Sequence, residues 1–459
     1  MARLFGTDGA RGVANRELTC ELALQLGRAA ATVLTRHLAH RATLVIGKDP
    51  RLSSDMLESA LTAGICSVGA DVVLLGTIPT PAVAHLVSRY QADAGVMISA
   101  SHNPAEYNGI KLFDARGYKL PDALEDEIEA VIQEQSWSLA SGLKLGRVTR
   151  RPEAADDYVR FLCATVDSDL LGMKIAGSPS PLKIAVDCAN GSASYTAPKL
   201  FAALGVDCAC IHCVPDGRNI NERCGSTHTD DLSQYVVEHG CDLGFAFDGD
   251  ADRCLAVDER GCLVDGDRIL ALLARDLRRQ GRLNQDTVVV TVMSNLGFFR
   301  FCEQNGLQTA VTKVGDRYVL EEMLKGGYCL GGEQSGHIIF TEYMTTGDGQ
   351  LSAIQLLQLF RKDDRRTLGE LAADMEPYPQ VLVNVQADRA AKERCNGDPE
   401  IADAIRRCEA ALGDDGRVLV RVSGTEPYIR VMLEGRDRAR ITELADELAG
   451  CIRQRTCKE

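Results

Sequence analysis

The stretch ATLVIGKDPRLSSDMLESALTAGICSVGADVVLLG, residues 42–76, shows the pattern that decides the fold. An apolar strand runs into a small polar loop, a helical stretch follows, a glycine stops the helix, and a second β-rich strand begins. The same order recurs in residues 182–213 and 287–313, and the stopping glycines are Gly69, Gly205 and Gly306. Apolar strands that alternate with helices are typical of parallel sheets covered on both faces, so the sequence predicts three α/β domains. The repetition reflects either a triplicated unit or the general rhythm of such sheets.

The last part of the chain has a different pattern. Strand-like segments at 379–386, 416–424 and 428–435 accompany helical segments at 400–412 and 438–455, which predicts a small α+β domain. Polar stretches that separate the segments predict four domains, at residues 1–150, 151–257, 258–373 and 374–459.

Composition and charge exclude several classes of protein. The net charge of −14 and the lack of a basic stripe argue against nucleic-acid binding, although local Arg and Lys groups can still bind a phosphate-bearing small molecule. No run of about 18 apolar residues could span a bilayer. The N-terminal residues also lack the apolar core of a signal peptide, so we expect a cytoplasmic protein without membrane contact.

Cysteine is abundant, with 17 residues scattered through apolar segments, and we expect most of them to be reduced core residues. One cluster contains the residue types that bind zinc: Cys208, Cys210, His212 and Cys213. As a strand, this segment would place the first three on one face and Cys213 on the other. Strand packing is the stronger interpretation of the cluster, and a metal site is the weaker one.

The motif DGDADR, residues 248–253, carries the strongest chemical signal. On an extended segment Asp248, Asp250 and Asp252 share a face, and three crowded carboxylates suit a hard cation such as Mg²⁺. An EF-hand would use Glu259 at its twelfth position, but its sixth position requires glycine and is Arg253 here. The flanking segments also look like strands rather than helices, so the EF-hand is disfavoured, and a solvated acidic turn is the plain alternative. Arg253 beside the acidic cluster would attract a phosphate.

Two further loops suit a phosphorylated sugar. RVSGTEPYIR, residues 421–430, combines exposed backbone N–H groups, hydroxyls and two arginines, which suit a phosphate, although a plain hairpin loop has a similar composition. GGEQSGH, residues 331–337, follows a strand, and Glu333 and Ser335 in it could hold sugar hydroxyls.

The stretch GVMISASHNPAEYNGIKLF, residues 95–113, offers two serines at the end of a strand. Ser101 has His102 beside it, whereas Ser99 lacks an adjacent histidine and is expected to shape the loop. No Asp or Glu is visibly paired with His102, which favours a positioning role over that of sole base.

Five motifs in order, FGTDGARG, SASHNPAEYNGIK, DGDADR, GGEQSGH and RVSGTEPYIRV, make the chain resemble the α-D-phosphohexomutase family, and most closely its bacterial branch that acts on glucosamine phosphates. The resemblance implies three related α/β domains and a C-terminal α+β (TBP-like) domain around a central cleft. It also implies an enzyme that interconverts glucosamine 6-phosphate and glucosamine 1-phosphate for UDP-GlcNAc and cell-wall precursor synthesis. Phosphomannomutase or phosphoglucomutase activity is the alternative within the family, and a non-catalytic sugar-phosphate sensor or a plain phosphatase lies outside it.

In the implied reaction, phospho-Ser101 donates its phosphoryl group to the phosphosugar, and the other phosphate of the resulting bisphosphate returns to Ser101. The resemblance implies one Mg²⁺ per site, a glucose or glucosamine 1,6-bisphosphate activator and activating phosphorylation of Ser101; a homodimer is common in this branch. It assigns catalytic roles to Ser101, His102, Lys111, Arg11 and Arg253, with proton transfer left open between Lys111 and His102. It assigns substrate binding to Glu333, Ser335, Arg421, Ser423, Gly424, Thr425 and Arg430, and metal binding to Asp248, Asp250, Asp252 and an oxygen on Ser101. Asp316 stands where other branches have a histidine, so no role of that histidine carries over.

Overall fold

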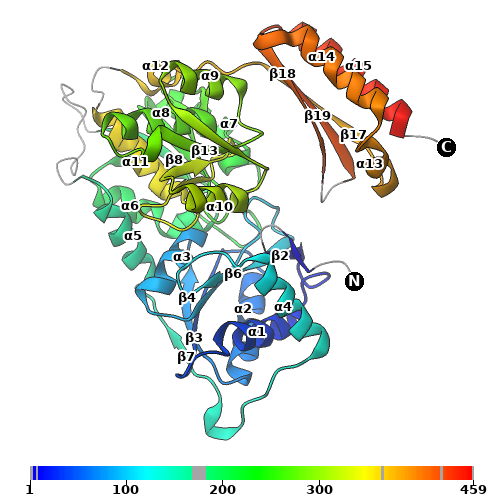
Figure 1. Ribbon diagram of the computed structural model, residues 1–459. Helices are drawn as coiled ribbons and strands as arrows, with labels where there is room; N and C mark the ends of the chain where they lie inside the picture. Colours follow the sequence, from blue (N-terminus) through cyan, green and yellow to red (C-terminus); the bar gives the residue numbers. More distant parts are fainter. Residues whose placement is uncertain (1–3, 7–8, 168–181, 363–365, 424–426, 457–459) are drawn as a thin grey trace. The chain divides into compact units, whose positions relative to one another are not determined.

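The protein is represented by a computed structural model that describes residues 4–6, 9–167, 182–362, 366–423 and 427–456 (Figure 1). The chain divides into two compact units. The first comprises Met1–Met293 and Asn305–Asp374, and the second comprises Ser294–Gln304 and Met375–Glu459. The first unit contains three sheets and the second contains one.

The first sheet has seven strands in the order β1-β2-β6-β5-β3-β4-β7. Strands β3, β4, β5 and β7 are parallel, while β6 runs antiparallel to β5 and to β2. The strands are β1 (Phe5–Gly6), β2 (Gly9–Val13), β3 (Thr43–Lys48), β4 (Asp71–Thr77), β5 (Ala94–Ile98), β6 (Tyr107–Asp114) and β7 (Val148–Arg150).

Helices cover both faces of this sheet. One face packs against α1 (Cys20–Thr35), α2 (Ser54–Ser67) and α4 (Asp122–Glu134) through an aliphatic core, as Figure 1 shows in blue and cyan. The other face contacts α3 (Thr80–Arg89), which approaches so closely that a Cβ atom at Gly47 would lie 2.5 Å from Val83 Cγ2. Glycine in β3 therefore makes room for this helix. Helix α5 (Ala154–Ala164) follows the sheet.

The second sheet has the order β12-β11-β10-β8-β9. Strand β8 is parallel to β9 and β10, whereas β10 and β11 form an antiparallel pair. Its strands are β8 (Lys183–Asp187), β9 (Asp207–Ile211), β10 (Leu243–Phe247), β11 (Cys254–Asp258) and β12 (Leu263–Val264). The helices of this region are η3 (Ser192–Tyr195), α6 (Ala197–Ala203), η4 (Gly225–Thr227), α7 (Asp230–His239) and α8 (Gly266–Arg279).

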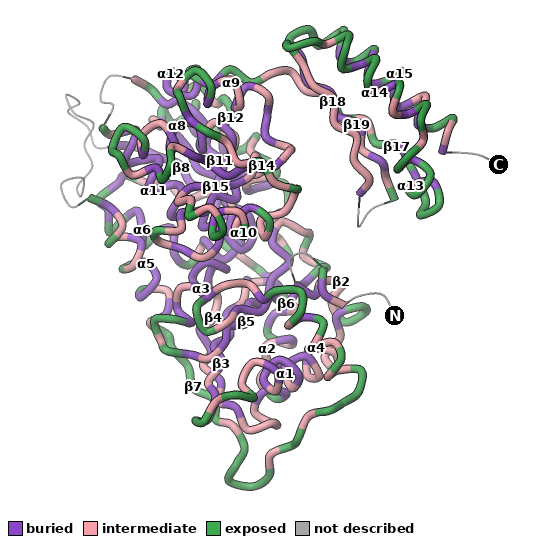
Figure 2. The backbone as a smooth tube through the Cα atoms, in the orientation of Figure 1, coloured by how far each residue is buried: buried purple, intermediate pink, exposed green. Residues whose placement is uncertain are grey.

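The third sheet has the order β14-β13-β15-β16, with β13 parallel to both of its neighbours. Its strands are β13 (Thr287–Thr291), β14 (Gln308–Thr312), β15 (Leu330–Gly332) and β16 (Ile338–Phe340). The accompanying helices are α10 (Asp316–Gly326), α11 (Gly349–Lys362) and α12 (Leu368–Ala372). Figure 2 shows that β5, β11 and β15 are buried along their lengths, as expected for strands covered on both faces.

The second unit has an antiparallel sheet in the order β17-β19-β18. Its strands are β17 (Gln380–Gln386), β18 (Gly416–Val422) and β19 (Tyr428–Gly435), and its helices are α9 (Leu296–Gln304), α13 (Arg389–Cys395), α14 (Pro399–Leu412) and α15 (Arg438–Thr456). Helix α14 begins where the Asp398 side chain accepts from the N–H groups of Glu400 and Ile401, with Pro399 at the first helical position. An apolar cluster joins α13, α14 and α15 to the sheet.

The predicted fold class, three α/β parts and a C-terminal α+β part, is confirmed. Each predicted helix stop is a glycine with positive φ, at +96° for Gly69, +70° for Gly205 and +63° for Gly306. The strands that flank each stop are parallel, as predicted. Among the described residues, no helix combines the length and apolar character needed to cross a membrane.

Candidate active site

Ser101 lies just beyond the end of β5 and has a left-handed backbone with φ of 53°. Such a conformation is costly for a residue with a side chain and persists only where its surroundings hold it. The Ser101 N–H donates to Ser99 Oγ at 2.9 Å, and the Ser99 hydroxyl donates to Asp49 Oδ2 at 2.6 Å. Ser99 therefore shapes the loop that presents Ser101.

Arg51 also holds this loop, and the sequence analysis did not identify it. Its guanidinium is buried, pairs with Asp49 at 2.8 Å, and donates to the carbonyls of Ser101 at 2.9 Å and Asn103 at 2.8 Å. Asn221 donates to the same two carbonyls at 2.9 and 3.0 Å. The sequence KDPRLSS, residues 48–54, could have indicated this role, because an aspartate and an arginine follow an apolar strand there.

The three aspartates lie in the turn between β10 and β11, so strands flank the motif and the EF-hand is excluded. Asp248, Asp250 and Asp252 are buried, and one carboxylate oxygen from each lies within 4.8 Å of the others. The Ser101 hydroxyl donates to Asp248 Oδ2 at 2.6 Å. The structure thus joins the two motifs that the sequence analysis had linked only by resemblance.

Lys111 of β6 completes this cluster. Its buried ammonium lies 2.8 Å from Asp250 Oδ2 and 3.4 Å from Asp252 Oδ2. The Thr80 hydroxyl donates to the same oxygen of Asp250 at 2.5 Å. Arg253 Nε also lies 3.9 Å from Asp252 Oδ1, so two cationic side chains lie beside the three buried carboxylates.

A divalent cation fits this donor set. Burial, followed by the charges of Asp252 and Asp250, raises the pKa of Asp248 well above its ordinary value. Asp252 Oδ1 is buried and accepts no hydrogen bond from any described residue. Oxygen-only donors of this kind suit Mg²⁺.

Cationic and imidazole groups surround the serine. His102 Nδ1 lies 3.4 Å from Ser101 Oγ, and burial together with the charges of Arg253 and Arg11 lowers the pKa of His102 to about 4. The imidazole is therefore neutral at pH 7. Burial by itself would lower the pKa of Arg253. The negative charges of Asp248, Asp252 and Glu333 have a larger combined effect, so the pKa of Arg253 is raised.

The loop with Glu333 lies close enough to act on Arg253, since the Glu333 charge contributes to that pKa. Glu333 Oε1 accepts from the Gly315 N–H at 3.2 Å, and Ser335 Oγ is buried without a hydrogen-bond partner among the described residues. A carboxylate and a hydroxyl of this kind can bind sugar hydroxyls.

Asp316 forms an ion pair with Lys119 at 2.5 Å, and His337 Nε2 lies 3.7 Å from the same carboxylate. Asp316 thus connects the loop after β6 to α10. Lys119 and Asp316 also line a cavity of about 300 Å³ beside that helix.

The second unit holds the arginines of the predicted phosphate loop. Arg421 of β18 and Arg430 of β19 are directly opposite in register, an arrangement of like charges that an anion would stabilise. Ser423 is buried, and Lys392 donates to its carbonyl at 2.8 Å, which brings a cation that the sequence analysis missed. Gly424 and Thr425 lie outside the described residues.

The cluster of Cys208, Cys210, His212 and Cys213 follows the alternating faces of a strand only in part. Cys208 and Cys210 share one face of β9 with their Sγ atoms 3.8 Å apart, as predicted. The prediction that His212 shares this face is wrong, because His212 has a left-handed backbone with φ of 42° and its ring contacts Asp187. The thiol of Cys213 donates to the Ser194 carbonyl at 3.7 Å.

Fold and site together define an enzyme class in which a serine lies beside a cluster of buried carboxylates. The chain belongs to the phosphoglucomutase/phosphomannomutase family. Alpha/beta/alpha domains I, II and III match residues 2–138, 156–261 and 265–378, and the C-terminal domain matches residues 382–450. The protein is therefore an enzyme of the mutase class.

Among curated proteins, the phosphoglucosamine mutase of Clostridium acetobutylicum is 54% identical over 99% of this chain and 100% of its own length. The phosphoglucosamine mutase of Thermoanaerobacter sp. is also 54% identical with the same coverage.

Solved structures share the fold. A phosphoglucomutase/phosphomannomutase family protein of Burkholderia thailandensis aligns with a TM-score of 0.82 at 24% identity, over 99% of this chain and 98% of its own. The N-acetylphosphoglucosamine mutase of Aspergillus fumigatus, solved with GlcNAc-6P and magnesium, aligns with a TM-score of 0.70 at 20% identity, over 99% of this chain and 96% of its own.

Proposed function

We propose that the protein interconverts glucosamine 6-phosphate and glucosamine 1-phosphate, with Ser101 as the phosphate carrier and a glucosamine 1,6-bisphosphate as the intermediate. The hydrogen bond from Ser101 to Asp248 is the observation that carries the proposal, because it places a nucleophilic hydroxyl against a buried three-carboxylate cluster. The relatives named phosphoglucosamine mutase support the choice of sugar. The product would feed UDP-GlcNAc and cell-wall precursor synthesis.

In this proposal Asp248, Asp250, Asp252 and the phosphorylated Ser101 would hold Mg²⁺. When bound, Mg²⁺ supplies charge that offsets the negative charge of the transferring phosphoryl group. Lys111, Arg11 and Arg253 add cationic charge around the same group. Ser99 and Arg51 keep the loop of Ser101 in place, so the reacting oxygen does not have to be ordered during the reaction.

Proton transfer requires a group that is neutral at the working pH. The His102 imidazole lies 3.4 Å from Ser101 Oγ and is neutral at pH 7, but its pKa of about 4 makes it a weak base. Lys111 instead lies against Asp250 and Asp252, which favours its charged form. Proton transfer therefore stays open between these two groups, with His102 positioned beside the reacting oxygen and Lys111 adding positive charge.

Substrate recognition in the proposal uses two further groups. Glu333 and Ser335 bind sugar hydroxyls, while Arg421, Ser423, Gly424, Thr425 and Arg430 bind the phosphate that is not reacting. A bisphosphorylated sugar must present each of its phosphates to Ser101 in turn, so a separate phosphate-binding group allows two orientations. Priming of Ser101 by a 1,6-bisphosphate activator, a cytoplasmic location and a homodimer complete the proposal.

A coupled assay with purified protein, Mg²⁺ and bisphosphate activator tests the choice of substrate. Glucosamine 6-phosphate should turn over with a kcat/KM at least tenfold above those for mannose 6-phosphate and glucose 6-phosphate. A preference for mannose or glucose would favour phosphomannomutase or phosphoglucomutase activity. Release of free phosphate as the main product would indicate a phosphatase, and absence of turnover would indicate a sensor.

A further inference from the structure

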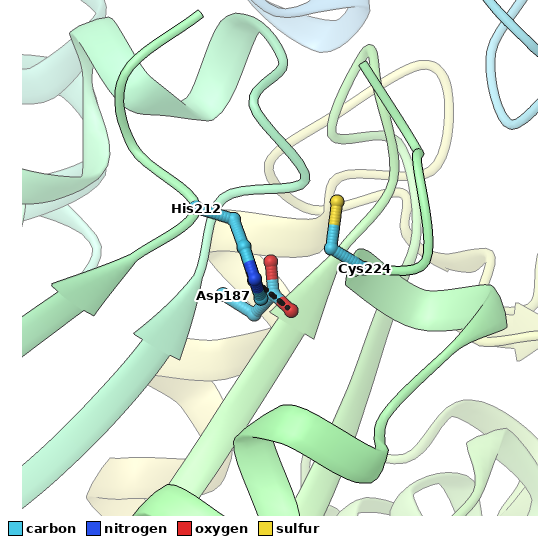
Figure 3. Close-up of side chains that lie close together, drawn as sticks. All are labelled: Asp187, His212 and Cys224. Atoms are coloured by element: carbon cyan, nitrogen blue, oxygen red, sulfur yellow. Dashed lines mark hydrogen bonds and ion pairs between the residues drawn. The ribbon is translucent and has the colours of Figure 1, made fainter. Parts of the chain in front are cut away.

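The ends of β8 and β9 bring together three side chains that take no part in the proposed reaction. Asp187 ends β8, His212 follows β9, and Cys224 precedes η4. One ligand atom from each, a carboxylate oxygen, a ring nitrogen and a sulfur, lies within 4.8 Å of the other two. Figure 3 shows the three side chains close together, with the His212 ring against the Asp187 carboxylate.

The geometry points to a second metal site, in which Asp187, His212 and Cys224 bind a zinc-type divalent ion. Carboxylate oxygen, imidazole nitrogen and thiolate sulfur are the three protein donors that zinc uses, at about 2.0–2.3 Å. Ligand atoms around such an ion are about 3–4 Å apart, and without an ion the three atoms lie within 4.8 Å of one another. The oxygen-only Asp248 cluster suits Mg²⁺, so the two sites select different metals.

The surroundings of His212 support a ligand role for its Nδ1. The Nε2 atom on the far side of the ring lies 3.3 Å from Asp231 Oδ2. Metal-binding histidines almost always donate their second ring N–H to a carboxylate or carbonyl, which fixes the tautomer and ring orientation. In the metal-free protein Nδ1 lies 3.0 Å from Asp187 Oδ2 and forms a hydrogen bond with it. An ion would displace the proton of this hydrogen bond, while Asp231 would keep the proton on Nε2.

Burial also suits this role. Asp187 and Cys224 are fully buried, so an ion would be held away from bulk water. Asp187 is preorganised, because its carboxylate accepts from the Ala189 N–H at 2.8 Å and the Gly225 N–H at 2.9 Å. Its oxygens retain further lone pairs for a cation.

The site would close the loop of residues 213–223 at its base, since His212 and Cys224 are its two flanking residues. Within this loop Asn221 donates to the carbonyls of Ser101 and Asn103, and the Gly217 carbonyl accepts from the Leu52 N–H at 2.9 Å. An ion between Asp187, His212 and Cys224 would therefore stabilise a loop that holds the Ser101 segment. Its role is structural, and it does not depend on the proposed reaction.

Cobalt(II) is the probe for this site, because it replaces zinc and reports thiolate ligands by absorption. The metal-free full-length protein is titrated with Co²⁺ in the presence of excess Mg²⁺, which occupies the oxygen-only cluster. We expect one Co²⁺ per chain with a thiolate charge-transfer band in the near ultraviolet, displaced by one equivalent of Zn²⁺. Absence of the band would overturn the proposal.

Matched variants separate this site from the neighbouring thiols. Cys224→Ser should abolish the charge-transfer band, whereas Cys210→Ser should retain it. Loss of the band in Cys210→Ser but not in Cys224→Ser would assign the metal to the Cys208 and Cys210 thiols and overturn the proposal. Asp231→Asn should weaken Co²⁺ binding about 10–100-fold, while the neighbouring Asp230→Asn should leave it unchanged. Equal affinities for the two aspartate variants would contradict the role of Asp231.

Thermal unfolding gives a readout for any variant that folds poorly. Zn²⁺ should raise the Tm of the wild-type protein and leave that of Cys224→Ser unchanged, because only a folded site binds the ion. A Zn²⁺-induced rise of equal size in both proteins would contradict the assignment.

Discussion

The hydroxyl of Ser101 donates a 2.6 Å hydrogen bond to Asp248 Oδ2, although 147 positions separate the two residues in the chain. This bond joins the end of β5 in the first sheet to the turn between β10 and β11 in the second. It brings the candidate phosphate carrier to the carboxylates that would hold its metal. The proposed phosphoryl transfer needs the serine and the carboxylates together, so it depends on this contact between Ser101 and Asp248.

Asp248→Asn should have opposite effects on stability and on function. The pKa of Asp248 is higher in the folded protein than in the unfolded chain, so in the absence of metal its protonated carboxyl group contributes stability that is fully present below the ordinary pKa. That contribution is lost as the pH rises towards the raised folded pKa. At pH 7 the amide should therefore raise the metal-free stability. Mutase activity should fall about 10²–10³-fold.

Thermal unfolding of Asp248→Asn with EDTA or with Mg²⁺ checks this prediction, together with the mutase assay. The Mg²⁺-induced rise in Tm seen in the wild-type protein should disappear in the variant. Asp207→Asn, at an exposed position, serves as the control. A variant that keeps the Mg²⁺ response would contradict the metal assignment.

Lys111→Met should destabilise the protein most when metal is absent. The substitution leaves Asp250 and Asp252 buried without their ammonium partner, which costs about 3–5 kcal/mol. Mg²⁺ should recover part of this loss, because a cation then offsets the carboxylates. Urea denaturation with and without Mg²⁺ measures the difference. Lys199→Met, which removes an exposed pair with Asp156, should cost less than about 1 kcal/mol under both conditions.

Arg51→Lys tests whether the guanidinium fork holds the Ser101 loop. Lysine keeps the charge but cannot donate to the Asp49 carboxylate and to the Ser101 and Asn103 carbonyls at once. We expect a loss of about 3 kcal/mol in the free energy of unfolding and a lower kcat. Arg116→Lys, at an exposed pair with Asp114, should change the free energy of unfolding by less than about 1 kcal/mol. Similar losses of unfolding free energy in Arg51→Lys and Arg116→Lys would show that the guanidinium fork of Arg51 is not needed to hold the Ser101 loop.

His85 should make the protein acid-sensitive. Its ring stacks on Phe161 at a centroid distance of 3.8 Å, and burial, followed by the charge of Arg89, lowers its pKa from 6.5 to about 4. Because the folded pKa is the lower one, the neutral ring contributes stability above pH 6.5, and this stability is lost as the pH falls towards 4. The loss amounts to about 3 kcal/mol.

Urea denaturation of the wild-type protein and His85→Phe between pH 4 and 8 measures this effect. Phenylalanine can keep the stack, and His85 Nε2 has no hydrogen-bond partner among the described residues that the substitution would remove. The variant should therefore lose about 3 kcal/mol less than the wild-type protein over this range. Parallel pH profiles would rule out His85 as the cause.

Local patterns were sufficient to predict much of the fold. Alternating apolar strands and helices identified the three α/β parts, and Gly69, Gly205 and Gly306 marked helix stops because only positive φ continues the chain there. The turn with Asp248, Asp250 and Asp252 was also predictable, since alternating aspartates between two strands share a face. The four predicted domain boundaries and the catalytic roles remain predictions.

Features that depend on distant contacts could not be predicted. Arg51 is recognisable as a loop-holding residue only when the Ser101 and Asn103 carbonyls lie beside it. The strand pattern placed His212 with Cys208 and Cys210, but its left-handed backbone turns it to Asp187, a partner in another strand. Tertiary contacts of this kind override the two-residue period of a strand.

The central claim, that Ser101 carries the phosphoryl group, is tested most directly by mass spectrometry of the protein after incubation with glucosamine 1,6-bisphosphate and Mg²⁺. We predict one phosphate per chain, located on Ser101 by peptide fragmentation, which passes to added glucosamine 6-phosphate and leaves the serine free. Ser101→Ala should carry no phosphate and should not turn over. Full turnover by Ser101→Ala, or a transferable phosphate on another residue, would contradict the account.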